Sequence, residues 1–382
     1  MQRYTFILIL LLAIPYIYIY RFYISKLHIP TALKLSYLLP IAIFVGIYLY
    51  MTFVATPEWL AGSHIGWIIA AFFFLVIPQA IFMLFSWPDQ VFAIKSMPFT
   101  KVSLITALVC LGCTIYATLY GKHRFEIKQA TYTSSRLPKS FDGYRIVQLS
   151  DIHLGSWQQY PEKLQEAVNI VNAQQPDLIV FTGDLVNARS AELNGLEHIL
   201  SQLNAPDGVY SVLGNHDYGN YFQWENIRQK AENLHELQER QANIGWKLLN
   251  NEHVYIYRSA DSIVLAGVEN WGKPPFNGRG NLQKALHGTG SDFKILLSHN
   301  PTHWRAEILP LSDTDLTLSG HTHAMQLKIG GYSPSSKFYH EWQGMYLENG
   351  RALYVNVGLG TVGMPFRLGA WPEITVLTLK KK

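Results

Sequence analysis

Five segments of this sequence place aspartate, asparagine and histidine side chains directly after short apolar runs. They are 150–153 (Ser-Asp-Ile-His), 182–184 (Thr-Gly-Asp), 214–217 (Gly-Asn-His-Asp), 298–300 (Ser-His-Asn) and 319–323 (Ser-Gly-His-Thr-His). Short apolar runs bounded by loops are typical of strands that are buried on both faces. Loops at the carboxyl ends of strands in open α/β sheets converge on one crevice. The five segments therefore predict a site with enough side chains to enclose two cations.

The spacing inside two of these segments favours shared ions. Asp151 and His153 are separated by one residue, and so are His321 and His323. Alternate side chains of an extended chain point the same way, so each pair can face one ion, although His321 and His323 can also serve different ions. A mixture of imidazole and carboxylate ligands suits Mn, Fe or Zn better than Ca or Mg.

Glycines precede three of the expected ligands. Gly183, Gly214 and Gly320 would let the chain turn sharply and bring backbone close to the metals. Each piece alone is common: an isolated D-x-H or H-x-H pattern usually arises by chance, and a Gly-Asp pair is usually a turn. The ordered set of five, each behind an apolar strand, is what points to a metal centre.

The surrounding sequence, from 141 to 382, alternates strand and helix patterns. Strands are expected at 144–149, 177–181, 209–213, 254–257, 263–268, 293–297, 315–318, 352–357 and 374–379. Helices are expected at 161–172, 191–203 and 224–243. This order predicts a layered α/β domain in which two sheets pack face to face with helices outside.

The first third of the chain is overwhelmingly apolar. Four stretches of about 20 residues, at 4–23, 35–54, 65–85 and 102–120, are long enough to cross a membrane. We therefore expect a transmembrane helical anchor at 1–122, a linker at 123–140 and a catalytic domain at 141–382. The first stretch could instead be a signal peptide, but no small-residue cleavage site follows it, and the other three would still anchor the chain. A buried helical hairpin of a soluble protein is the remaining alternative.

Charge gives limited information about partners and orientation. The net charge is +4, and no basic stripe of the kind that binds nucleic acid is present, so we expect no nucleic-acid partner. If the chain crosses the membrane four times, the loops after the first and third spans lie on one side and carry five lysines and arginines. The segments before the first span and after the fourth lie on the other side and carry four. The positive-inside rule then favours a catalytic domain outside the cytoplasm, by a margin of one charge.

The ordered motif set resembles the calcineurin-like metallophosphoesterase superfamily over about residues 140–380. The stretch 137–153 and the late Gly-Thr-Val-Gly at 360–363 are most similar to its membrane-associated bacterial branch, the YkuE-like and YaeI-like phosphodiesterases. The resemblance implies a two-sheet sandwich flanked by helices in a protein of the bacterial cell membrane. It also implies a role for each site residue: Asp151, His153 and His323 bind one metal, Asn215, His299 and His321 bind a second, Asp184 bridges both, and His216 is the non-ligand catalytic histidine.

This sequence departs from the superfamily pattern at one position. Many of these phosphatases carry an aspartate three residues after the bridging aspartate, where it orients the catalytic histidine; here the residue is Asn187. Asp217 could compensate, or it could be a turn residue that accepts hydrogen bonds from backbone amides. Arg367 is a further candidate, either as a bidentate ligand of a substrate phosphate or as a solvated surface residue.

Two classes of function follow. The first is a membrane-anchored, two-metal hydrolase in which a metal-bridged hydroxide attacks a phosphomonoester, phosphodiester or pyrophosphate, with His216 protonating the leaving group. Its substrate would be lipid-linked or met at the membrane surface, and UDP-diacylglucosamine is a specific candidate. The second is a non-catalytic membrane sensor or interaction protein that metals only stabilise. A complete set of ligands around an open site favours the first class.

Overall fold

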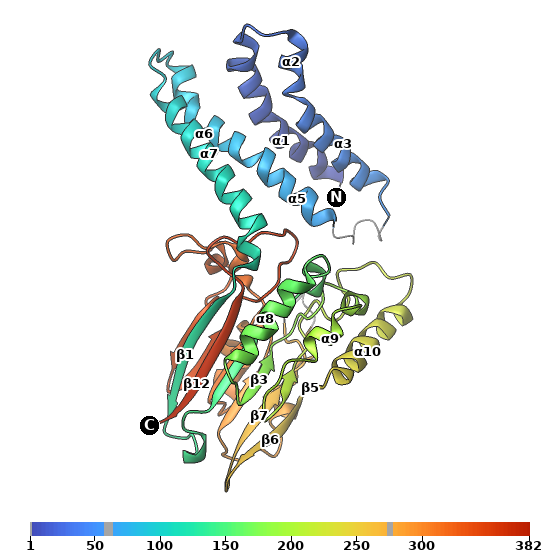
Figure 1. Cartoon of the computed structure of the whole chain (residues 1–382), viewed down its shortest axis with the longest axis vertical. Coiled ribbons are helices and arrows are strands. Elements are labelled where there is room, and N and C mark those ends of the chain that lie inside the picture. Colours follow the sequence, from blue (N-terminus) through green and yellow to red (C-terminus); the bar gives the residue numbers. More distant parts are fainter. Residues whose placement is uncertain (1, 57–63, 273–277) are drawn as a thin grey trace. The chain divides into compact units, whose positions relative to one another are not determined.

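The computed structural model describes residues 2–56, 64–272 and 278–382. The chain divides into two compact units (Figure 1). One comprises Met1–Tyr120 together with Gly363–Phe366, and the other comprises Gly121–Val362 together with Arg367–Lys382.

The first unit is helical. Its helices are α1 (Gln2–Phe22), α2 (Thr31–Ser36), α3 (Leu39–Phe53), α5 (His64–Leu75), α6 (Ile77–Val91) and α7 (Pro98–Leu119). On α7 the side chains of Val102, Ile105 and Val109 are each about 60% exposed. A helix that presents such a face to its surroundings is typical of contact with lipid or with a partner.

Two helical segments of the described chain are long and apolar enough to cross a membrane. They are Ile65–Val91, which spans α5 and α6, and Pro98–His123. Helix α3 is apolar but has only 15 residues. The expected bundle of four spans therefore stays a prediction, with two spans supported by length and composition.

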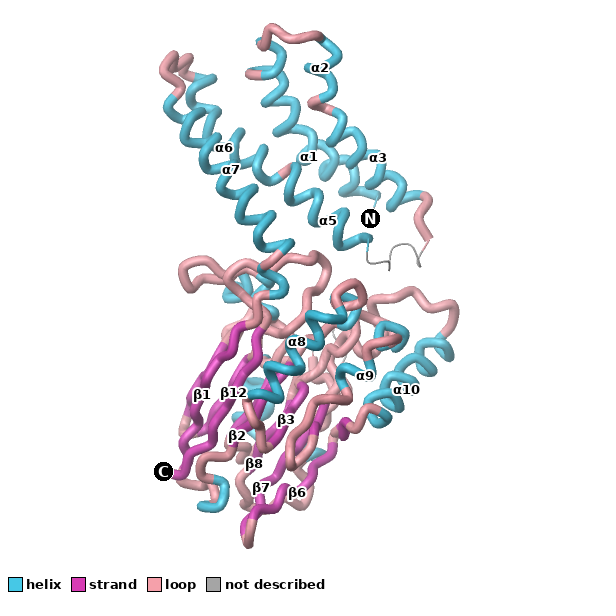
Figure 2. The backbone as a smooth tube through the Cα atoms, viewed as in Figure 1, coloured by secondary structure: helices cyan, strands magenta, loops and turns pink. Residues whose placement is uncertain are grey.

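The second unit contains two six-stranded mixed sheets (Figure 2). The first has the order β1 (Glu126–Ser134), β12 (Glu373–Lys381), β2 (Arg145–Leu149), β3 (Leu178–Phe181), β4 (Val209–Ser211), β5 (Trp246–Leu248). The second has the order β10 (Gly344–Glu348), β11 (Arg351–Val355), β9 (Leu316–Ser319), β8 (Lys294–Leu297), β7 (Asp261–Gly267), β6 (Glu252–Arg258).

The central strands β2, β3, β8 and β9 are buried on both faces, which explains why they read as nearly continuous apolar runs. Along β2, Ile146 faces the layer shared with the second sheet, where it packs in one cluster with Leu265. Its neighbour Val147 faces the opposite side, in a cluster with Leu164 of α8 (Pro161–Ala173). Alternation with a period of two thus divides each strand between two cores.

Helices cover the outer face of each sheet. Helix α8, the short α9 (Glu197–Leu200) and α10 (Ile227–Asn243) lie over the first sheet (Figure 1). On the second sheet, α11 (Leu282–Ala285) and the helical segment beginning at Trp304 pack against Leu296 and its neighbours. The predicted pair of facing sheets with helices outside is confirmed.

Two expectations about elements were wrong. Residues 123–140, expected as a linker, contain β1, which pairs in parallel with β12 along its whole length. The helix expected at 191–203 is instead a 3-10 turn (Ser190–Leu193) followed by α9. Strands β5 and β10 were not expected.

Candidate metal centre

The five polar segments follow strands of both sheets. β2, β3 and β4 are parallel neighbours in the first sheet, and β8 and β9 are parallel neighbours in the second. Their carboxyl ends lie together, so residues distant in the sequence meet at one end of the sandwich. All seven predicted ligands, and His216, lie at this end within contact distance of another member of the set.

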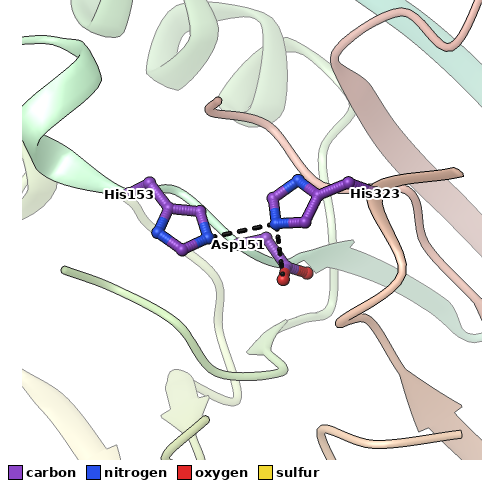
Figure 3. Close-up of side chains that lie close together, drawn as sticks. All are labelled: Asp151, His153 and His323. Atoms are coloured by element: carbon purple, nitrogen blue, oxygen red, sulfur yellow. Dashed lines mark hydrogen bonds and ion pairs between the residues drawn. The ribbon is translucent and has the colours of Figure 1, made fainter. Parts of the chain in front are cut away.

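The first cluster consists of Asp151, His153 and His323 (Figure 3). His323 Nε2 lies 3.2 Å from Asp151 Oδ1 and 3.1 Å from His153 Nε2. All three side chains are buried. These are the residues expected to share the first metal.

The second cluster is centred on His299. Its Nε2 atom lies 3.1 Å from Asp184 Oδ2, 3.2 Å from Asn215 Oδ1 and 3.2 Å from His321 Nδ1. The other ring nitrogen, Nδ1, lies 2.8 Å from the carbonyl oxygen of Thr182 and therefore donates to it. A carbonyl that accepts from Nδ1–H in this way holds the ring so that Nε2 is available to a metal.

Asp184 lies between the two clusters. Its Oδ2 atom is 3.1 Å from His299 Nε2 and 3.8 Å from His153 Nε2. Its Oδ1 atom accepts a hydrogen bond of 2.8 Å from the backbone amide of His216. One carboxylate oxygen therefore faces both sets of ligands, as a bridging residue must.

The donor set fits divalent cations. Ligand atoms that carry lone pairs face one another at 3.1–3.2 Å in both clusters, and only a shared proton or a cation makes such an arrangement favourable. Nitrogen ligands combined with carboxylate oxygens suit Mn, Fe or Zn. The side chains present thus fit a site for divalent metal ions.

Electrostatics favours the protonation states that metal binding needs. Burial would raise the pKa of Asp184, but the nearby histidines, His299 first, hold it well below its usual range. Burial and the surrounding imidazoles lower the pKa of His153 and bring that of His321 to about 3. Burial would also lower the pKa of His299, but the Asp184 carboxylate raises it to about 9. A metal at His299 must therefore displace a proton, which makes its affinity pH-dependent.

The backbone at the ligands is not extended. Asp151 and His153 have φ of 49° and 47°, and His321 and His323 have φ of 74° and 49°. The expected extended backbone is therefore wrong here. Asp151 and His153 nevertheless meet in one cluster, whereas His321 and His323 belong to different clusters, the second alternative for that pair. Left-handed conformations of non-glycine residues are costly and cluster at functional sites. Asp184, with φ of 61°, is a fifth candidate ligand in this conformation.

The three glycines act in two ways. Gly183 adopts φ of +96°, which supplies the expected sharp turn. Gly214 and Gly320 lie at sites of close approach instead. A Cβ on Gly214 would overlap Asp184 Oδ1, and a Cβ on Gly320 would overlap Ser150 Oγ and Asp151 Oδ2.

His216 is oriented by a main-chain group. Its Nδ1 lies 2.7 Å from the carbonyl oxygen of Asn187, so Nδ1 carries the hydrogen and donates it. The ring stacks on Tyr221 with a centroid distance of 4.1 Å. Asp217 is a turn residue: its carboxylate accepts hydrogen bonds from backbone amides, including those of Asp184 and Gly214. The backbone of Asn187 therefore fills the role left open by the missing aspartate.

Two tyrosines at the site were not predicted. The Tyr221 hydroxyl accepts a 2.9 Å hydrogen bond from Asn215 Nδ2, and the Tyr339 hydroxyl lies 3.1 Å from His321 Nε2. Asn215 Nδ2 and His321 Nε2 are the atoms of these two ligands that point away from the expected metal position. Tyr221 follows the Gly-Asn-His-Asp segment closely enough to have been considered, whereas the sequence gives no signal for Tyr339.

Arg367 is not accessible to solvent. Its side chain is fully buried, and its guanidinium donates to the carbonyl oxygens of Val357, Gly360 and Ala370. Nη2 also lies 3.2 Å from His323 Nδ1. Both suggested roles, phosphate ligand and solvated arginine, are wrong. Arg367 holds the loop behind the first cluster.

His303 belongs to a buried chain behind the His299 loop. Its Nδ1 lies 2.9 Å from Ser298 Oγ, its Nε2 lies 3.2 Å from Glu307 Oε2, and its ring stacks on Trp271. Burial lowers the pKa of His303 to about 4, although Glu307 acts in the opposite direction. The folded protein therefore keeps this histidine neutral at pH values where an exposed histidine is charged.

We predict that His303 makes the protein sensitive to mild acid. Between about pH 6.5 and 4 the unfolded chain binds a proton here that the folded chain does not, so its stability is complete above this window and falls as pH falls through it, by about 1–3 kcal/mol. Urea unfolding at pH 7 and pH 5 should show a smaller decrease for His303→Gln than for the wild type. The exposed His198→Gln is the matched control. Equal decreases in all three proteins would contradict the prediction.

Comparisons with known proteins agree with this geometry. A family profile described as calcineurin-like phosphoesterase matches residues 144–325. The uncharacterized metallophosphoesterase YkuE of Bacillus subtilis is 34% identical over 291 residues, which are 72% of this chain and 92% of that protein. A transmembrane protein with metallophosphoesterase domain from Danio rerio is 30% identical over 371 residues, 91% of this chain and 80% of that protein.

A third relative has a name that specifies a substrate. The UDP-2,3-diacylglucosamine pyrophosphatase LpxG of Chlamydia muridarum is 28% identical over 332 residues, 72% of this chain and 96% of that protein. The family profile, the extent of the match to YkuE and the convergence of Asp and His side chains at the strand ends lead to one conclusion: this chain belongs to the calcineurin-like metallophosphoesterase family.

Proposed function

We propose that the chain hydrolyses phosphoester or pyrophosphate bonds with two divalent cations. Asp151, His153 and His323 would hold one cation, His299, His321 and Asn215 the other, and Asp184 both. The observation that carries this proposal is the position of Asp184 Oδ2, within 3.8 Å of His153 Nε2 and 3.1 Å of His299 Nε2.

Side chains of the protein would transfer the proton and position the reacting groups. When bound, two cations supply an activated water and offset the charge that develops on the phosphoryl group. His216 Nδ1–H is held by the Asn187 carbonyl, which leaves Nε2 directed toward His153 and Asp184. In the doubly protonated imidazolium form, Nε2–H would protonate the leaving oxygen and leave the neutral Nδ1–H ring. Tyr221 fixes the His216 ring by stacking and the Asn215 amide by a hydrogen bond.

The acid role of His216 predicts a dependence on the leaving group. His216→Ala should reduce kcat about 10²–10⁴-fold for an alkyl phosphodiester, whose leaving oxygen needs a proton. The decrease should be much smaller for a p-nitrophenyl ester, because p-nitrophenolate leaves without protonation. The exposed His235→Ala is the control. Equal losses on both substrates would assign His216 to substrate binding instead.

The substrate we propose is lipid-linked. The apolar first third supplies two candidate membrane spans, and one relative is named as a pyrophosphatase of UDP-2,3-diacylglucosamine. We propose an integral protein of the bacterial cell membrane, with four spans and a catalytic domain that includes β1 as well as residues 141–382. A nucleotide-linked substrate requires the site to face the cytoplasm, whereas the charge distribution favours the other side by one residue. A reporter fused after Lys382 decides between them.

Removing metal tests the function directly. Purified full-length protein should hydrolyse bis-p-nitrophenyl phosphate, lose this activity to background on treatment with a chelator, and regain it on addition of Mn. Elemental analysis should find two metal ions per chain in the active form. Two bound ions without metal-dependent turnover would favour the non-catalytic, metal-stabilised alternative.

A further inference from the structure

Residues 325–338, which follow the last metal-binding segment, expose large apolar side chains. Met325, Ile329, Tyr332 and Phe338 are 49%, 65%, 51% and 71% exposed, respectively. Isolated exposed apolar residues are normal, but four within one short segment beside a functional site are not. The segment therefore has the composition of an interaction surface.

The backbone holds these side chains outward. Ile329 and Tyr332 form reciprocal backbone hydrogen bonds of 2.9 and 3.0 Å around Gly330 and Gly331, both with positive φ. A two-glycine turn of this kind is tight and well defined. The base of the segment is fixed by a hydrogen bond of 2.7 Å from the amide of Lys328 to the carbonyl oxygen of Leu368. The apolar side chains are thus presented on an ordered scaffold.

The charge of the segment is uniformly positive. Lys328 and Lys337 lie within it, and the sequence has no aspartate or glutamate from 325 to 340. The next acid, Glu341, is 3% exposed and pairs with Arg305. A surface that combines lysines with exposed aromatic and aliphatic residues is complementary to an anionic membrane interface.

The segment is also continuous with the metal centre. Tyr339, the next residue after Phe338, lies with its hydroxyl 3.1 Å from His321 Nε2. A bilayer that contacts residues 325–338 would therefore lie beside the site that we propose to act on lipid-linked phosphoesters.

We propose that residues 325–338 dock the catalytic unit onto the surface of a bilayer that contains anionic lipids. Ile329, Tyr332 and Phe338 enter the headgroup region, and Lys328 and Lys337 face the lipid phosphates. This contact is separate from the membrane-spanning helices and does not depend on hydrolysis. It goes beyond the proposed function because it assigns a second membrane contact and its lipid preference.

The test uses the full-length chain in nanodiscs, with Cys110 and Cys113 replaced by alanine. An environment-sensitive fluorophore is attached through the substitution Phe338→Cys or, as control, Tyr257→Cys. Tyr257 is 72% exposed on β6, which runs antiparallel to β7, so it lies at the end of its sheet opposite the metal centre. We expect blue-shifted emission and protection from aqueous iodide at 338 in discs with phosphatidylglycerol, and neither effect at 257.

Two further comparisons vary the charge of the lipids and the charge at position 337. Discs of phosphatidylcholine alone should protect position 338 less, and Lys337→Glu should weaken the docking equilibrium by at least about fivefold in anionic discs. Equal iodide access at 338 and 257 in anionic discs would overturn the proposal. Equal protection of position 338 in anionic and phosphatidylcholine discs would overturn it as well. Hydrolysis of bis-p-nitrophenyl phosphate is measured in the same samples. Protection without turnover would count against the proposed function and leave the docking surface in place.

Discussion

Asp184→Asn should abolish hydrolysis, with a loss of roughly a thousandfold or more in kcat/KM, or about 4 kcal/mol of transition-state stabilisation. The substitution keeps the shape of the side chain and removes its charge. An amide has one acceptor oxygen, and here it must either keep the 2.8 Å hydrogen bond from the His216 amide or face His153 and His299. The single oxygen cannot face both clusters of ligands and also accept the hydrogen bond from the His216 amide.

Metal content separates this effect from misfolding. Asp184→Asn should retain fewer than two metal ions per chain, yet remain folded, because the loss of a buried charge removes a desolvation cost. Asp142→Asn, at an exposed carboxylate, is the matched control. A variant with two bound ions and turnover within tenfold of the wild type would show that Asp184 does not bridge the metals.

Asp217→Ala should have the largest effect on folding. The Asp217 carboxylate accepts hydrogen bonds from the backbone amides of Asp184, Leu185, Val186 and Gly214, at 2.8–3.2 Å. Truncation leaves these donors buried without that acceptor, and each such donor costs about 1–3 kcal/mol. We expect a loss of about 3–5 kcal/mol, a large part of the stability of a typical domain.

The change is read as a shift of the urea midpoint at constant m-value. Asp217→Asn should recover part of the loss, because its amide oxygen still accepts. Asp261→Ala is the matched control: Asp261 is partly exposed and accepts from one backbone amide, that of Ser140, and should shift the midpoint little. Equal midpoints for Asp217→Ala and Asp261→Ala would refute the structural role.

The strands that carry the site could be predicted because they are short, apolar and buried on both faces. Strand β1 could not, for a physical reason. At this edge of the sheet Glu126 and Lys128 lie on the less exposed face and Ile127 on the more exposed one, so the strand lacks a regular apolar alternation. It exists because it pairs with β12, far along the sequence. Local pattern carries little information about such tertiary pairing.

The helix expected at 191–203 does not form because a locally hydrogen-bonded turn competes with it. The carboxylate of Glu192 accepts hydrogen bonds from the amides of Asn187, Ala188 and Arg189, which stabilises a turn before the apolar residues. Asn194 and Gly195 then interrupt the helical backbone, with φ of +78° at Gly195. Side-chain bonds to backbone amides commonly override helical periodicity.

Residue types at the strand ends identified the side chains that converge, but not the geometry that brings them together. The left-handed backbone at Asp151 and His323 depends on neighbouring loops, such as the amide of Asp151 bonding to the Gly183 carbonyl. Tyr339 reaches His321 only after a turn of the chain that sequence spacing does not define.

The division of the ligands between the two sheets gives the cations a mechanical role. Asp151, His153 and Asp184 belong to loops of the first sheet, and His299 and His323 to loops of the second. Ions bound between them would cross-link the two halves of the sandwich at one end, and would add to the contacts of His299 with Asp184 and of His323 with Asp151. Emptying the site should then raise amide hydrogen exchange at the carboxyl ends of β3 and β8 before it reaches the turn between β6 and β7 at the far end. Loss of metal and loosening of the sandwich would then proceed together.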